Sequence, residues 1–123
     1  MSKIQLTTRA QQVVVRIQRK LPAELRDLAA KLPVTYHDWP DDEILGAEFE
    51  PDIMGLFVGE PHGVEAGLGN SVPPQIFLFV ENIFDEAEGD LSRYDEEVKL
   101  TYLHELGHYL GWDEDEVEAR GLG

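Results

Sequence analysis

Two histidines and a glutamate in the last quarter of the sequence have a spacing that suits a divalent metal ion. The segment reads His104-Glu105-Leu106-Gly107-His108. On an α-helix, residues four positions apart differ in direction by about 40°, so both imidazoles project from one face and can share a metal ion. Glu105 lies about 60° from His108 on the other side, where its carboxylate can reach a water molecule at the metal without binding the metal. The spacing predicts a zinc site with His104 and His108 as ligands.

The chemistry expected of such a site is hydrolysis of an amide bond. The chain contains no cysteine, so any metal must be held by nitrogen and oxygen atoms. Zinc lowers the pKa of a bound water molecule toward about 7 and polarises a substrate carbonyl. A nearby carboxylate can take the proton from the attacking water and return it to the leaving amine. We therefore predict Glu105 as the catalytic base.

A catalytic zinc site also needs a third protein ligand and an open fourth position. A distant glutamate on a following helix would need more chain than the 15 residues that follow His108. The shorter pattern His-Glu-x-x-His-x-x-Gly-x-x-ligand fits directly, because Gly111 occupies the turn position and Glu114 the ligand position. We predict Glu114 as the third metal ligand. The alternatives lie in the same acidic run: Asp113, Asp115 and Glu118.

The metal pattern lies in a segment with the signals of a capped helix. Ser92 is the predicted N-cap, and Asp95 is its capping partner three residues later. The helix is expected to run to about Leu110, after which Gly111 allows the chain to leave sharply.

Helices and strands are also predicted earlier in the chain. Apolar residues recur at helical spacing over residues 8–21, and Pro22 suits the first position of a second short helix that ends before Pro33. Residues 34–37, 53–58 and 75–80 have strand character. The unbroken apolar run within residues 75–80 predicts burial at the centre of a sheet.

Length and charge limit the remaining possibilities. A chain of 123 residues is expected to form a single domain, spanning residues 1–123. Residues 1–37 carry seven Lys or Arg against two acids, and the remainder carries three against 23, which gives +5 and −20 and a total of −15. A surface this acidic repels a phosphate backbone, so nucleic acid is not expected as a partner. No segment has the length of a signal peptide core or a membrane helix, so we expect a cytoplasmic protein.

These features resemble the minimal zincin-fold family of bacterial metallopeptidases over about residues 21–118. Besides the metal pattern, the segments Pro-Asp-Ile-Met-Gly-Leu-Phe-Val-Gly at 51–59 and Pro-Pro-Gln-Ile-Phe-Leu-Phe at 73–79 resemble that family's two principal strands. The resemblance implies an α+β fold in which a small mixed sheet packs on N-terminal helices and on the metal-binding helix. It also implies an edge strand that can receive an extended peptide, and zinc ligation by His104, His108 and the acid after Gly111. The family pattern usually has aspartate where Glu114 stands.

Two other interpretations compete with a peptidase acting on a peptide or protein substrate. One is a zinc-loaded binding module that holds a partner peptide with little or no turnover. The other is a structural or interaction protein without metal, in which both histidines are surface residues and the acidic surface serves solubility. His37 and His62 are weaker candidates for site residues, because a lone histidine at a strand end or in a loop is more often simply solvated.

Overall fold

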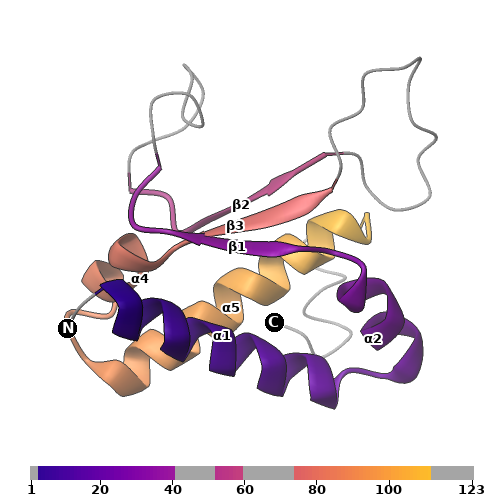
Figure 1. Ribbon diagram of the computed structural model, residues 1–123, viewed down its shortest axis with the longest axis horizontal. Coiled ribbons are helices and arrows are strands. Elements are labelled where there is room, and N and C mark those ends of the chain that lie inside the picture. The colour runs from indigo at the N-terminus through magenta and orange to yellow at the C-terminus, as the bar shows by residue number, and fades with distance from the viewer. Residues whose placement is uncertain (1–2, 41–51, 60–73, 112–123) are drawn as a thin grey trace.

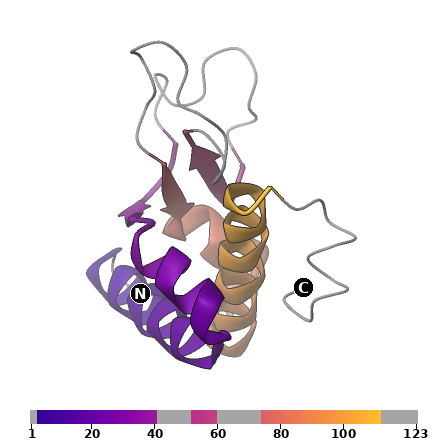
Figure 2. The same cartoon turned by 90° about the vertical axis from the view of Figure 1, so that its right-hand side faces the viewer.

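A three-stranded sheet lies on a layer of helices in the computed structural model, which describes residues 3–40, 52–59 and 74–111. Figure 1 shows the strands on one side of the molecule and the helices on the other. The view along the sheet in Figure 2 shows the same two layers end on. The elements are α1 (Lys3–Lys20), α2 (Ala23–Ala30), β1 (Val34–His37), β2 (Gly55–Val58), β3 (Gln75–Phe79), α4 (Val80–Glu86) and α5 (Leu91–Tyr109).

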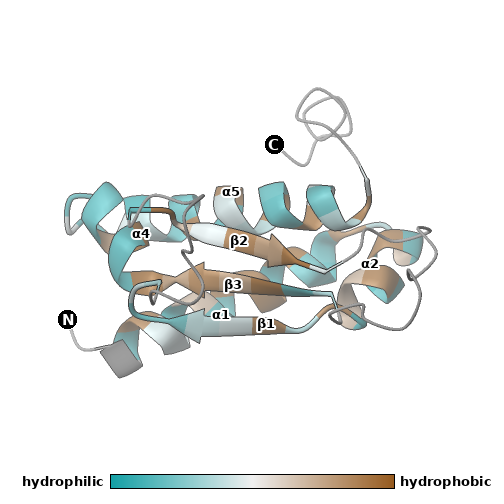
Figure 3. Ribbon diagram, turned by 90° about the horizontal axis from the view of Figure 1, so that it is seen from above, coloured by the Kyte–Doolittle hydropathy of each residue, from teal (hydrophilic) through white to brown (hydrophobic). Residues whose placement is uncertain are grey.

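The sheet has the order β1-β3-β2 and is mixed. β3 pairs with β1 in parallel and with β2 in antiparallel orientation. The predicted central position of the apolar run is therefore confirmed, and Ile76 and Leu78 on β3 are fully buried. Figure 3 shows β3 as hydrophobic along most of its length. β2 is an edge strand, because only one of its sides faces another strand of the described sheet.

α1 carries the helical periodicity predicted from the sequence. Its buried side chains continue the spacing of three and four residues, and they are Leu6, Ala10, Val13 and Val14. The helix begins at Lys3, five residues before the predicted start, because Leu6 extends the same buried face toward the N-terminus. α2 follows immediately, with Pro22 as the residue before its first turn.

α4 was not predicted, and it corrects the C-terminal end of the third strand. The strand stops at Phe79, and Val80 is the first residue of the helix. Val80, Ile83 and Ala87 are fully buried at helical spacing. In the sequence Val80 simply continues the apolar run of the strand, so the change from a period of two to a period of 3.6 is hidden. The predicted second strand is also shorter, beginning at Gly55 rather than at residue 53.

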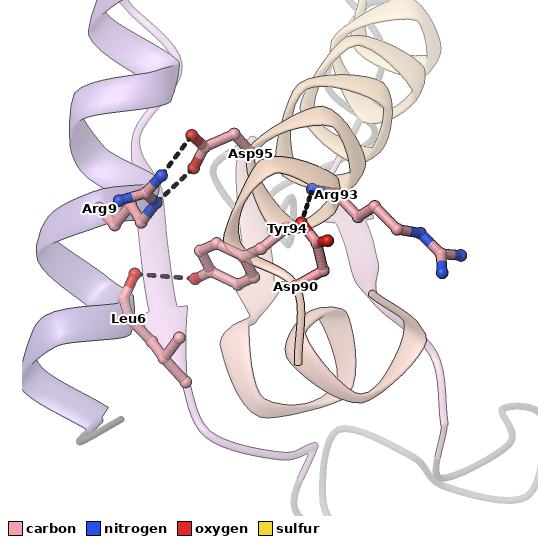
Figure 4. A network of polar contacts seen from close by, with 6 residues as sticks. All are labelled: Leu6, Arg9, Asp90, Arg93, Tyr94 and Asp95. Atoms are coloured by element: carbon pink, nitrogen blue, oxygen red, sulfur yellow. Dashed lines mark hydrogen bonds and ion pairs between the residues drawn. The ribbon is translucent and has the colours of Figure 1, made fainter. Parts of the chain in front are cut away.

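The start of α5 differs from the prediction. The N-cap is Asp90, whose side chain accepts a hydrogen bond from the backbone N–H of Arg93 at 3.1 Å. Ser92 lies inside the first turn. Asp95 is not a capping partner, because its carboxylate accepts two hydrogen bonds from the guanidinium of Arg9 on α1, at 2.7 and 2.8 Å. Figure 4 shows both contacts. Several acidic and hydroxyl residues at 90–95 satisfy the capping pattern, and tertiary contacts decide among them.

α1 and α5 pack directly against each other below the sheet. Next to the Arg9–Asp95 ion pair, the buried Tyr94 donates a hydrogen bond from its hydroxyl to the carbonyl of Leu6 at 2.8 Å (Figure 4). Burial raises the pKa of the Tyr94 hydroxyl above its usual range, so it stays protonated and keeps donating. These contacts fix the helix that carries the metal pattern against the rest of the core.

No helix within the described residues combines the length and apolarity that a bilayer crossing requires.

Candidate metal centre

The two imidazoles of the metal pattern meet at one end of α5. The Nε2 atoms of His104 and His108 are 3.0 Å apart, and the ring planes are nearly perpendicular, at 85°. His104 is half-buried, whereas His108 is exposed in the last turn of the helix. The pair therefore faces solvent on one side, which leaves room for a ligand to approach.

This pair of nitrogen atoms fits a tetrahedral metal ion. Two nitrogen ligands at about 2.0–2.1 Å from a tetrahedral zinc ion lie about 3.3–3.4 Å from each other. The observed separation of 3.0 Å differs from this by a few tenths of an ångström, which small rotations of the side chains can supply. His104, Glu105 and His108 each offer one ligand atom, and the three atoms lie within 4.8 Å of one another. The donor set of nitrogen and oxygen is the one that zinc accepts in a chain without cysteine.

Glu105 points into the protein beside the two histidines. It is only 9% exposed, and burial raises the pKa of its carboxyl, while the nearby His108 and a backbone N–H lower it. That N–H belongs to Phe57 on β2 and donates to the Glu105 Oε1 atom at 3.1 Å. The edge strand thus holds one carboxylate oxygen of Glu105, so this side chain has a fixed direction next to His104 and His108.

The hydrogen bond from Phe57 was not foreseen from the sequence. In an antiparallel pair, backbone groups alternate between pointing at the neighbouring strand and pointing away from it. Phe79 N–H donates to the carbonyl of Met54, so Met54 faces β3 and the backbone groups of Gly55 and Phe57 face outward. The sequence predicts a strand at this position. Which of the backbone groups of that strand face α5 depends on the tertiary fold.

A close approach of β2 to α5 brings Phe57 to Glu105. A Cβ atom built on Gly55 would lie 2.6 Å from Cγ2 of Thr101, one helical turn before His104. Only glycine avoids this overlap, and a glycine inside a strand is a typical sign that another element comes near. Gly55 is therefore part of what positions the site.

The end of α5 has the turn that the metal pattern requires. Gly111 has a φ angle of +77°, a left-handed conformation that favours glycine and takes the chain out of the helix. This confirms the predicted exit at Gly111. The predicted third ligand Glu114 and its alternatives Asp113, Asp115 and Glu118 lie outside the described residues, so they stay predictions.

His37 does not join the site. It lies on β1, at the other edge of the sheet from β2, where its ring contacts Phe77 and Phe79 and its Nε2 atom lies 3.2 Å from the hydroxyl of Thr35. His62, the other weak candidate, lies outside the described residues.

A mixed sheet resting on a helix with His104, Glu105 and His108 on its last turns is the arrangement of a zincin-type fold with a candidate metal site. A sequence model of the zincin-like metallopeptidase family matches residues 29–123, and the chain belongs to that family. The expected α+β fold and the expected family are both confirmed. A comparison with individually curated proteins gave no match.

Proposed function

We propose that this protein is a zinc-dependent peptidase, with Glu105 as its general base. The observation that carries the proposal is the arrangement of three side chains on one helix: two imidazole nitrogens 3.0 Å apart, with a buried carboxylate directly beside them. Membership of the zincin-like metallopeptidase family supports the same chemistry. We further propose Glu114 as the third ligand, because the left-handed turn at Gly111 suits a chain that returns toward the histidines.

Each residue has a defined part in this mechanism. His104 and His108 would hold zinc, which would supply Lewis-acid chemistry by acidifying water and polarising the scissile carbonyl. Glu105 accepts the proton of the attacking water on the carboxylate oxygen that Phe57 does not hold, and then delivers it to the nitrogen of the leaving amine. The Phe57 N–H keeps the carboxylate in one direction during both transfers. Such preorganisation lowers the barrier because no reorientation is needed at the reacting step.

Replacing Glu105 with Gln tests the mechanism. Gln keeps the shape and can still accept the hydrogen bond from Phe57, but it cannot take up a proton. We expect hydrolysis of a fluorogenic peptide library to fall by about 10²–10⁴-fold, with the zinc content measured by mass spectrometry unchanged. Glu96→Gln is the matched control, because it makes the same change at an exposed position of α5. Full activity in Glu105→Gln would refute the assignment of the base.

One observation favours a second function, a zinc-loaded module that binds a peptide with little turnover. The hydrogen bond between Phe57 and Glu105 joins β2 to α5, so the carboxylate also has a structural use that needs no chemistry. In that case wild type and Glu105→Gln would bind a peptide equally and neither would cleave it. Fluorescence anisotropy with labelled peptides, measured beside the cleavage assay, distinguishes the two functions.

A further inference from the structure

A pocket of about 340 Å³ adjoins His104 and lies along α5 toward the N-terminal end of that helix. His104 and Glu105 are among the residues that line it. Glu97, which is half-buried, also lines it and lies two helical turns earlier on α5. The pocket is therefore continuous with the place where a scissile bond would lie, and it extends away from that place along the helix.

Most of the other lining residues are apolar, with Thr101 as the polar exception. Ile53 and Met54 contribute from the segment that leads into β2, and Leu100 contributes from α5. Leu100 is 38% exposed, which makes it one of the few large apolar side chains on the described surface that are open to solvent. Apolar walls of this kind stabilise the aliphatic stem of a long side chain.

Glu97 adds a negative charge at a defined distance from the reacting centre. Residues 97, 100, 101 and 104 recur on one face of α5, and seven residues of helix span about 10.5 Å along the axis. A long substrate side chain together with an ion-pair contact can cover most of this distance. Within the described part of the chain, no Lys, Arg or His forms an ion pair with the Glu97 carboxylate. None of the described cationic residues therefore neutralises the Glu97 charge.

We propose that this pocket selects peptides with a lysine or arginine side chain next to the scissile bond, with Glu97 binding the cationic head and Met54 and Leu100 holding the stem. The inference rests on the proposed peptidase function and names its substrate class. The net charge of −15 acts in the same direction, because it raises the local concentration of cationic peptides. Neutral aliphatic and acidic side chains are the competing occupants.

The test uses zinc-loaded protein and quenched peptides that differ at one residue beside the cleaved bond. That residue is lysine, norleucine or glutamate, since norleucine has the stem of lysine without its charge. We expect kcat/KM for the lysine peptide to exceed that for the norleucine peptide by about fivefold, the size of a partly exposed charge pair. In Glu97→Gln this ratio should fall to about 1, and in Glu97→Lys the glutamate peptide should be preferred to the lysine peptide.

Glu96→Gln is again the matched control, and it should keep the wild-type ratio because Glu96 does not line the pocket. An equal ratio in wild type and Glu97→Gln would overturn the inference. If wild type cleaves none of the peptides, the peptidase function fails, and the pocket is judged by binding alone. Tighter anisotropy binding of the lysine peptide that is lost in Glu97→Gln would then support the pocket assignment, whereas equal binding or no binding would overturn it.

Discussion

Glu105 is a charged group placed where charge is unfavourable. The residue is only 9% exposed, and burial raises the pKa of its carboxyl above the ordinary value of 4.5. The two influences that oppose this shift are His108 and the Phe57 N–H, and both belong to the proposed site. A polar group that is costly to bury and held in one direction is typical of catalytic positions, where stability is lost in exchange for function.

This cost predicts a pH dependence of stability in the metal-free protein. Because the folded protein holds the Glu105 proton more tightly than the unfolded chain does, it is stabilised at low pH. That stability is lost as the pH rises from about 4.5 through the raised pKa. Glu105→Gln removes the ionisation. We therefore expect its free energy of unfolding to exceed that of wild type by an amount that grows as the pH rises from about 4.5 through the raised pKa.

Urea unfolding in the presence of a chelator measures this difference. Glu96→Gln serves as the control, since it removes an exposed carboxylate from the same helix. A difference between Glu105→Gln and wild type that stays constant across the pH range would show that burial does not control the Glu105 ionisation.

At the scale of elements, the contact between β2 and α5 determines the geometry of the site. It contains the Phe57–Glu105 hydrogen bond, the glycine that lets the two backbones approach, and one wall of the pocket beside His104. Gly55 is needed here for space, because its added Cβ would meet Thr101 Cγ2 at 2.6 Å and the Phe77 carbonyl oxygen at 3.3 Å.

Gly55→Ala should therefore destabilise the protein by about 1–3 kcal/mol, as overpacking does elsewhere. Thr101→Ser removes the Cγ2 atom that the new methyl group would meet. The double variant Gly55→Ala with Thr101→Ser should recover part of the loss, with a coupling of about 1 kcal/mol in a double-mutant cycle. Chemical denaturation of the four proteins gives the values. Simple additivity of the two changes would mean that β2 and α5 are not in close contact at this point.

The elements found from sequence are those with an unambiguous period. The three- and four-residue spacing around Ala10 and Val13 predicted α1, and the apolar run around Leu78 predicted the central strand. Boundaries were less accurate. α4 was missed because its first residue also continues a strand pattern, and the N-cap of α5 was assigned to Ser92 instead of Asp90 because several nearby residues can cap a helix.

The site likewise has one part that the sequence predicts and another part that it does not. The spacing of His104, Glu105 and His108 depends only on helix geometry, so the sequence was enough to predict that they meet. The Phe57 N–H that holds Glu105 is a backbone group on an element 48 positions away, and no side-chain pattern reports it. The role of Asp95 was misread for a related reason, since its partner Arg9 is 86 positions away.

At the scale of the whole molecule, the charge is unevenly distributed. α1 contains five Lys or Arg and no acid, whereas the chain as a whole has a net charge of −15. Arg9 uses one of these cations to anchor α1 to α5 through Asp95, so part of the asymmetry has a structural use. The remaining acidic excess favours cations near the surface, which suits both a metal ion and the basic peptides proposed as substrates.

The most direct test of a zinc site formed by His104 and His108 is calorimetric titration of zinc into metal-stripped protein. We expect one ion per chain in wild type, and affinity more than about 100-fold weaker in His104→Ala and in His108→Ala, because each variant removes a ligand. His37→Ala should bind like wild type, since this histidine lies at the other edge of the sheet. Absence of zinc binding in wild type, or unchanged affinity in the two ligand variants, would contradict the assignment.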